Sequence, residues 1–165
     1  HNFVHYQWGK TLLIGGGPDE DCLKNLISKY KLWDNFRFLG TRYDIPNLLH
    51  IMNIFVLPSL REGLPIVLIE ALAACCPVIA TNIDGIPEII SHQKNGLLVL
   101  PENVEELTSA IETLITNESL RNKFIEEGLL TVKSKFTIEK MIKDYNMLYQ
   151  NYINRKHELF YISNA

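Results

Sequence analysis

The chain has 165 residues, of which 47% are hydrophobic and 21% charged, and its formal net charge is −3. This length favours one compact domain, and the composition is too apolar for a disordered chain. Because no block of basic residues occurs, nucleic acid is not expected as a partner. The longest apolar stretch, residues 64–78, is interrupted by Pro65, Glu70 and Pro77, and it is shorter than the roughly 20 apolar residues that a membrane-spanning helix needs.

The cysteines and the start of the chain bear on its setting. Cys22, Cys75 and Cys76 cannot all pair within one chain, which favours a reducing, cytoplasmic location. The sequence starts at His1 without the pattern of a secretory signal, so we expect a fragment of a larger protein. No cofactor is expected. No metal is expected either, since no His/Cys cluster has ligand spacing.

Short apolar runs alternate with helical periodicity over the first 100 residues. The apolar runs predict buried strands at residues 11–14, 36–39, 54–57, 78–80 and 97–100. The segments between them predict helices at residues 19–30, 45–51, 65–74 and 86–90. This alternation predicts an α/β fold, a Rossmann-like open parallel sheet flanked by helices, with ligands beyond the carboxyl ends of the strands.

The last third of the chain predicts helices only, at residues 104–115, 119–133 and 137–153, so that a helical C-terminal extension follows the sheet. Asn103 is placed to cap the first of these helices. We expect one domain over residues 1–153 and a frayed tail over residues 154–165.

The segment over residues 58–71 leaves a predicted strand, crosses a loop and enters a helix. Pro65 suits the first turn of that helix. The free N–H groups of Ile66 and Val67 would then point out of the helix end, where they can hold a phosphate, and Gly63 permits close approach of a ligand.

Two carboxylates, Glu62 and Glu70, flank this helix start with seven residues between them. Each can accept a pair of hydroxyl hydrogen bonds, and a sugar nucleotide offers vicinal hydroxyls on either side of its diphosphate. The alternatives are a solvated loop carboxylate for Glu62 and an exposed helix-face carboxylate for Glu70. The apolar neighbours of Glu70 favour a partly buried carboxylate that needs a partner.

Two glycine motifs are less informative. Gly16 lies in Gly15-Gly16-Gly17-Pro18, which predicts a tight strand-to-helix turn facing the cleft, with contact to a ligand as the alternative to a purely structural turn. In Gly85-Ile86-Pro87-Glu88, the Glu88 carboxylate either orients the cleft loop or is favoured by the dipole of a helix start.

The chain resembles the carboxy-terminal, nucleotide-sugar-binding domain of retaining glycosyltransferases of the GT-B fold, the glycosyl transferases group 1 family. The resemblance covers residues 1–149 and includes the Glu-x7-Glu signature in its Pro-Ser-x-x-Glu-Gly-x-Pro context. Six further motifs stand in the same order: Leu12-Leu13-Ile14-Gly15-Gly16-Gly17-Pro18, Phe38-Leu39-Gly40, Phe55-Val56-Leu57-Pro58-Ser59, Pro77-Val78-Ile79-Ala80-Thr81, Gly85-Ile86-Pro87-Glu88 and Asn95-Gly96-Leu97-Leu98-Val99. The family pattern has a glycine of positive φ where this chain has Cys75, which predicts an altered turn or local strain.

The resemblance assigns roles to the matching residues. Glu62, the candidate catalytic residue, and the backbone after it are expected to contact the donor sugar, and Glu70 is expected to bind the ribose. The remaining substrate-binding candidates are Gly63 and Leu64 at the sugar, Ile66 and Val67 at the diphosphate, Gly16 at the cleft, and Thr41, Arg42 and Tyr43 at the base.

The implied reaction is transfer of a sugar from a nucleoside-diphosphate sugar to an acceptor hydroxyl with retention, in polysaccharide or glycolipid synthesis. The family's basic pair and its acceptor-binding amino-terminal domain would lie upstream of His1, so we expect a truncated first strand and an inactive fragment. Membrane association, as a peripheral protein, is expected only through that missing half. The alternatives are half of a sugar-nucleotide epimerase and a non-catalytic sugar-nucleotide-binding module.

Overall fold

The computed structural model describes residues 9–163, with side chains described through residue 154. The chain forms two compact units, His1–Ile45 and Pro46–Ala165. The backbone ladders follow the same division, because β1 and β2 form one sheet and β3, β4 and β5 form another. The prediction of one domain over residues 1–153 stays a prediction.

The first unit is a parallel strand pair joined by one helix. β1 (Thr11–Ile14) pairs with β2 (Phe36–Gly40), and α1 (Glu20–Lys29) connects them. The turn after β1 needs a glycine, because Gly15 has a φ of 106° and donates its N–H to the Gly40 oxygen at 2.8 Å. The predicted tight turn between the first strand and its helix is therefore present.

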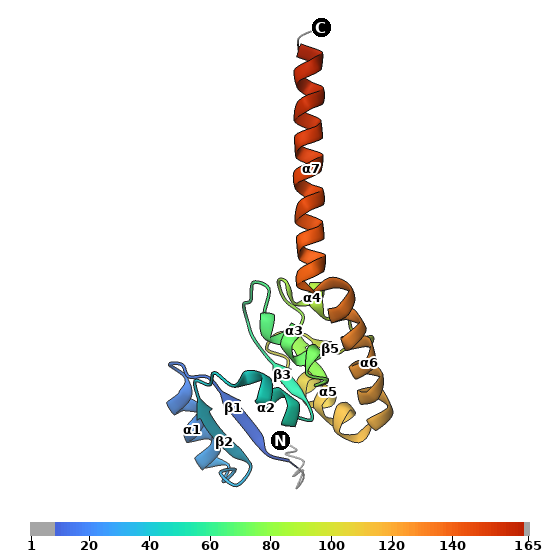
Figure 1. Ribbon diagram of the computed structural model, residues 1–165. Helices are drawn as coiled ribbons and strands as arrows, with labels where there is room; N and C mark the ends of the chain where they lie inside the picture. The colour runs from blue at the N-terminus through green and yellow to red at the C-terminus, as the bar shows by residue number, and fades with distance from the viewer. Residues whose placement is uncertain (1–8, 164–165) are drawn as a thin grey trace. The chain divides into compact units, whose positions relative to one another are not determined.

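The second unit contains a three-stranded parallel sheet in the order β3-β4-β5. Its strands are β3 (Phe55–Leu57), β4 (Val78–Thr81) and β5 (Leu97–Val99). The helices α2 (Ile45–Ile51), α3 (Ile66–Ala73) and α4 (Ile86–Ile89) precede or connect them (Figure 1). Every residue of the central strand β4 is buried, which explains why its first three residues are apolar.

Two further helices, α5 (Val104–Thr116) and α6 (Glu118–Lys135), complete the core of this unit. Asn103 caps α5 by accepting the N–H of Glu106 at 3.0 Å, as the sequence predicted. A buried apolar cluster joins the sheet to both helices and consists of Ile79, Leu97, Val99, Ala110, Leu114 and Phe124. The α3 helix packs against α6, where a Cβ on Gly128 would lie 2.9 Å from a Leu72 methyl carbon.

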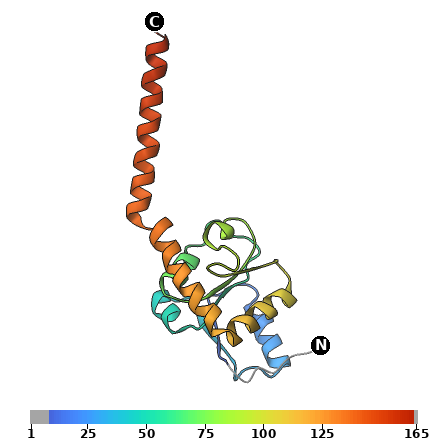
Figure 2. The ribbon, with the colours of Figure 1, turned by 90° about the vertical axis from the view of Figure 1, so that its right-hand side faces the viewer.

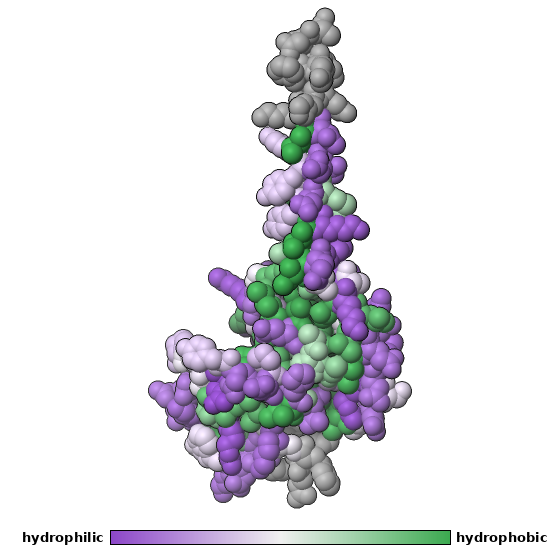
Figure 3. All heavy atoms as spheres, in the orientation of Figure 1, coloured by the Kyte–Doolittle hydropathy of each residue, from purple (hydrophilic) through white to green (hydrophobic). Residues whose placement is uncertain are grey.

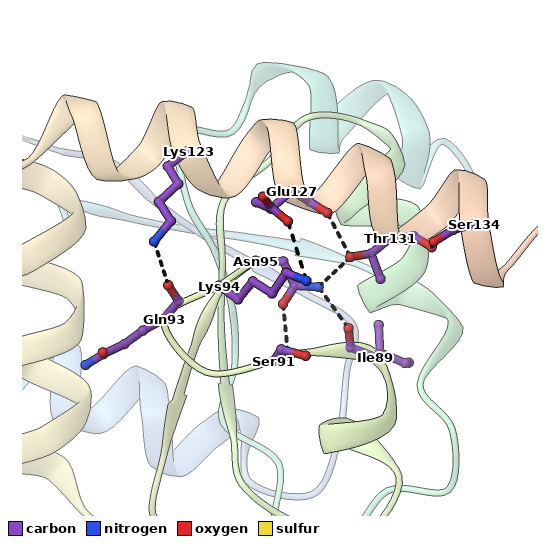
Figure 4. Close-up of polar contacts among 9 residues, drawn as sticks. All are labelled: Ile89, Ser91, Gln93, Lys94, Asn95, Lys123, Glu127, Thr131 and Ser134. Atoms are coloured by element: carbon purple, nitrogen blue, oxygen red, sulfur yellow. Dashed lines mark hydrogen bonds and ion pairs between the residues drawn. The ribbon is translucent and has the colours of Figure 1, made fainter.

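A buried amide binds the loop before β5 to α6 (Figure 4). Asn95 is 1% exposed and accepts the Ser91 N–H at 2.7 Å. Its amide nitrogen donates to the Ile89 oxygen at 3.0 Å and to the Thr131 hydroxyl at 3.1 Å. One side chain therefore fixes the end of α4, the following loop and the middle of α6.

The α3 helix ends on a cysteine in the left-handed conformation. Cys75 has a φ of 60°, its N–H donates to the Leu72 oxygen at 3.2 Å, and the Cys76 N–H donates to the Ala71 oxygen at 2.9 Å. These two bonds form a Schellman motif, the helix ending that usually carries glycine at this position. The expectation of backbone strain at Cys75 is confirmed, and the turn itself is unaltered.

The last helix, α7 (Ile138–Ser163), continues beyond Ile153, where the periodic pattern predicted its end. Figures 1 and 2 both show it leaving the end of α6, and its side chains at residues 141–154 are all exposed. Hydrophobic side chains follow part of one side of it (Figure 3). Met141, Tyr145 and Leu148 in this helix are 52%, 53% and 62% exposed. Within residues 9–163, no helix combines the length and the apolar character that crossing a bilayer requires.

Candidate functional site

The site lies where two neighbouring strands of the second unit end. Because β3 and β4 are parallel neighbours, the loops that follow them leave the same edge of the sheet. Two hydrogen bonds join these loops: the Gly85 N–H donates to the Gly63 oxygen at 3.2 Å, and the Glu62 N–H donates to Asp84 Oδ2 at 2.9 Å. An open hollow of about 640 Å³ adjoins them and is lined by Leu60, Arg61, Glu62, Gly63, Ile83 and Asp84.

The half-buried carboxylate of Glu62 is held in place by hydroxyl groups. The Ser59 hydroxyl donates to Glu62 Oε1 at 2.7 Å. Thr81, a buried residue at the end of β4, donates its own hydroxyl to the Ser59 carbonyl at 2.6 Å. Since β4 is the most buried of the described strands, Thr81 holds Ser59 against the core, and Ser59 in turn orients the Glu62 carboxylate.

The start of α3 differs by one residue from the prediction. Pro65 is the N-cap of α3 rather than its first helical residue, and the Leu68 N–H donates to the Pro65 oxygen at 3.0 Å. Over the residues that the structure describes, the N–H groups of Ile66 and Val67 have no acceptor. These two amides lie at the positive end of the helix without an acceptor among the described residues, as predicted, and their binding of an anion stays a prediction.

Glu70 is exposed, so the predicted partly buried carboxylate is wrong. The helix period explains this outcome, because Leu68, Ala71 and Leu72 share the face that packs inward and leave Glu70 on the outer face. Sequence neighbours of a helical residue do not surround it in space. The carboxylate therefore needs no protein partner to compensate for burial.

The glycine and the leucine between the two carboxylates face open space. A Cβ built on Gly63 would have no atom within 4 Å, and Leu64 is 48% exposed. Gly85 contrasts with them, since a Cβ there would lie 2.2 Å from the Gly63 oxygen. Packing within the protein thus demands glycine at Gly85 but not at Gly63.

Four of the predicted binding residues, Gly16, Thr41, Arg42 and Tyr43, belong to the first unit, where all are exposed. Arg42 forms a two-pronged pair with Asp44, with nitrogen–oxygen distances of 2.8 and 2.7 Å. These hydrogen bonds raise the pKa of Arg42 and lower the pKa of the Asp44 carboxyl. Tyr43 is 97% exposed. The six other candidates, Glu62, Gly63, Leu64, Ile66, Val67 and Glu70, belong to the second unit, where Glu62 and Gly63 line the hollow. The binding roles of all ten residues stay predictions.

Acidic residues elsewhere form no metal site in the described part of the chain. Asp19-Glu20-Asp21 has the Asp-x-Asp spacing found in some metal sites. Its central carboxylate instead pairs with Lys24 at 2.6 Å. Across residues whose side chains are described, no three His, Cys, Asp or Glu side chains are grouped so as to hold a metal ion.

Sequence reasoning missed the contribution of Asp84 and Thr81 to the site. One of its two alternatives for Glu88 was that this residue orients the cleft loop. The observed hydrogen bonds to the loop after β3 come instead from Asp84 and Gly85. The signal was present in the strand order. A residue that ends β4 lies beside the loop that follows β3, whatever its distance along the chain.

Known proteins are similar to this chain in sequence and in fold. Residues 9–130 match the family Glycosyl transferases group 1. A Campylobacter jejuni N,N'-diacetylbacillosaminyl-diphospho-undecaprenol alpha-1,3-N-acetylgalactosaminyltransferase is 32% identical over 143 residues, which cover 85% of this chain and 38% of that protein. The chain thus spans well under half of that relative.

Two solved structures extend the comparison. The C-terminal domain of a glycosyl transferase group 1 family protein from Francisella tularensis has a TM-score of 0.70 and 31% identity, covering 78% of this chain and 70% of that one. S. aureus TarM, whose structure contains UDP, has a TM-score of 0.77 and 25% identity over 85% of this chain and 29% of that one. The α/β architecture is that of the C-terminal domain of GT-B glycosyltransferases, and the chain belongs to the glycosyl transferases group 1 family.

Proposed function

We propose that this chain is the donor-binding domain of a glycosyltransferase that moves a sugar from a nucleoside-diphosphate sugar to an acceptor hydroxyl with retention. The acceptor is a polysaccharide or a glycolipid. The observation that carries the proposal is the pairing of two unoccupied N–H groups, those of Ile66 and Val67, with a carboxylate whose position the protein already fixes, that of Glu62.

The two parts suit the two ends of a sugar diphosphate. Amides at a helix start favour a diphosphate, since their dipoles and the helix dipole point the same way. The Glu62 carboxylate is acceptor-only and suits sugar hydroxyls. Gly63 lies between them with open space where a Cβ would be, which leaves room for a ligand to approach the backbone. Such a site would act mainly by positioning the donor and stabilising the departing diphosphate.

The relatives support the choice of substrates. The structure of S. aureus TarM contains UDP, and the name of the Campylobacter relative gives a diphospho-undecaprenol acceptor. A UDP-sugar donor and a lipid-linked or polymeric acceptor are therefore the first to test. Because the chain aligns with 38% of that relative, we assign sugar transfer to a longer protein and expect the domain alone to bind nucleotide without turnover.

The proposal is tested on the full-length protein with a panel of UDP-sugars, namely UDP-glucose, UDP-galactose, UDP-N-acetylglucosamine and UDP-N-acetylgalactosamine. We expect calorimetric binding of at least one of them, and retention is checked by NMR of the anomeric linkage formed. Failure of every nucleotide sugar to bind, with UDP itself also failing, would overturn the proposal.

A substitution of Glu70 tests the ribose assignment. Glu70→Gln keeps one acceptor oxygen but removes the charge that strengthens a hydroxyl hydrogen bond from about 1 to roughly 1.5–3 kcal/mol. The loss of about 0.5–2 kcal/mol should weaken donor binding by about two- to thirtyfold, since about 1.4 kcal/mol is a factor of ten. The fold should persist because Glu70 is exposed.

The matching ligand is a 2′-deoxyribose donor. Removing the 2′-hydroxyl of the donor should weaken binding to Glu70→Gln less than it weakens binding to the wild type. Titration of both donors against both proteins gives the free energy of coupling between Glu70 and that hydroxyl. Glu105→Gln, which changes an exposed carboxylate on α5, is the control and should leave affinity unchanged. A coupling free energy near zero would show that Glu70 is only a helix-face carboxylate.

A further inference from the structure

Asp84 stands out among the residues lining the hollow because the protein holds it in an uncommon conformation. Its φ is 44°, in the left-handed region that a side chain with a Cβ occupies at a cost and that Asp tolerates better than most residues. This conformation accompanies the short distance of 2.9 Å between its Oδ2 and the Glu62 nitrogen. The carboxylate is exposed, so burial does not hold it in place.

The residue after it makes a second bond to the same loop. The Gly85 N–H donates to the Gly63 oxygen at 3.2 Å, and Gly85 has no room for a Cβ. Adjacent residues of the β4 loop therefore hold adjacent residues of the β3 loop, one by its N–H and the other by its C=O. Ile86, which follows them, is fully buried, so the chain that makes these two hydrogen bonds is held by the core.

From this geometry we infer that Asp84 is a positioning residue for donor binding, acting through the backbone of Glu62. The inference rests on the proposed function and deepens it. Ser59 sets the orientation of the Glu62 carboxylate, and Asp84 sets the position of the peptide from which that carboxylate projects. Loss of the Asp84 acceptor leaves the Ile66 and Val67 amides untouched, so it should affect the sugar end of the donor and not the diphosphate end.

Three substitutions separate the possible roles of Asp84 in the full-length protein. Asp84→Asn keeps an acceptor oxygen and a side chain that tolerates the left-handed conformation. Asp84→Gly keeps the backbone freedom and removes the acceptor, and Asp84→Ala removes both. The control is Glu102→Gly, since Glu102 is also an exposed carboxylate residue with a positive φ of 58°, and it makes no hydrogen bond to the β3 loop in the described structure.

The first measurement needs no ligand. Amide hydrogen exchange of the peptide around Glu62 should be about fivefold or more faster in Asp84→Gly and Asp84→Ala, the factor expected for loss of one hydrogen bond. Asp84→Asn and Glu102→Gly should exchange like the wild type. Equal exchange rates in Asp84→Gly and the wild type would overturn the inference.

The second measurement compares UDP with the UDP-sugar that the wild type binds best. Asp84→Gly should weaken binding of the UDP-sugar about five- to tenfold and leave UDP binding unchanged, with Asp84→Asn restoring wild-type affinity. A general structural defect would weaken both ligands alike, and that result would also overturn the inference. If the wild type binds no nucleotide sugar, the proposed function itself fails; if it binds one and Asp84→Gly binds it equally well, only the inference fails.

Discussion

Replacing Cys75 by glycine should stabilise the second unit. Cys75 occupies the left-handed position of the Schellman motif that ends α3, with a φ of 60°. Its side chain is exposed, so the substitution removes no core packing. The backbone hydrogen bonds of the motif, from Cys75 to Leu72 and from Cys76 to Ala71, do not depend on a side chain and should persist in the variant.

The expected magnitude follows from two opposing effects. A residue with a Cβ loses roughly 1–2 kcal/mol in the left-handed conformation, and glycine avoids this loss. Glycine also increases the conformational entropy of the unfolded chain, which lowers the free energy of unfolding by about 0.5–1 kcal/mol. The net gain in the free energy of unfolding is therefore about 0.5–1 kcal/mol, or about 1–4 °C in Tm for a chain of this size.

Urea and thermal unfolding followed by far-UV circular dichroism, under reducing conditions, measure this gain. Cys75→Ala removes the thiol and keeps the Cβ, so its stability should stay near that of the wild type. Ala73→Gly should change the free energy of unfolding in the opposite direction. Ala73 is an exposed helical residue at the end of α3, and glycine there should lower stability by about 0.5–1 kcal/mol. The strain argument fails if Cys75→Gly is no more stable than Cys75→Ala while Ala73→Gly behaves as expected.

Two further predictions concern the buried polar groups of this unit. Burial raises the pKa of the Cys76 thiol to about 11, so iodoacetamide at pH 8 should label Cys22 and Cys75 in the native protein and Cys76 only after unfolding, as peptide mass spectrometry would detect. Because folded Cys76 retains a proton that an unfolded cysteine loses near pH 8.5, its contribution to stability should be complete below about that pH and decline as pH rises toward 11. Asn95→Ala should lower the free energy of unfolding by roughly 2–4 kcal/mol, because it leaves buried backbone groups unpaired, whereas Thr131→Val removes one of the Asn95 bonds and should cost about 1 kcal/mol. Equal losses in the two variants, measured by urea unfolding, would contradict the account of Asn95 as the group that joins α4 to α6.

Most helices and strands were predictable because local patterns determine them. β1 and α2 have the predicted bounds, and the buried β4 differs by one residue from its apolar run. The two-unit organisation was not predictable, since it depends on which strands pair across the chain. The end of α7 was missed because the prediction relied on an apolar period, and residues 154–163 lack a clear period in sequence although the helix continues to Ser163.

The candidate site divides in the same way between local and non-local features. The free amides of Ile66 and Val67 and the open space at Gly63 follow from a local loop-to-helix pattern, and the structure contains them. The exposure of Glu70 depends on which helix face packs inward, and the bond from Glu62 to Asp84 spans 22 residues. Neither follows from the residues adjacent in sequence.

The two carboxylates differ in how far the protein prepares them for a ligand. Glu62 already accepts a hydroxyl hydrogen bond, and its peptide is held by Asp84, so binding would order it little further. Glu70 is exposed and has no hydrogen bond from its side chain among the described residues, so a ligand would have to immobilise it at a cost of roughly 0.5–1.5 kcal/mol. A charge-assisted bond of roughly 1.5–3 kcal/mol at Glu70 would then contribute only about 1 kcal/mol net. Donor selectivity should therefore depend more on the pre-positioned carboxylate of Glu62, and Glu70 should add a smaller increment of affinity at the other end of the donor.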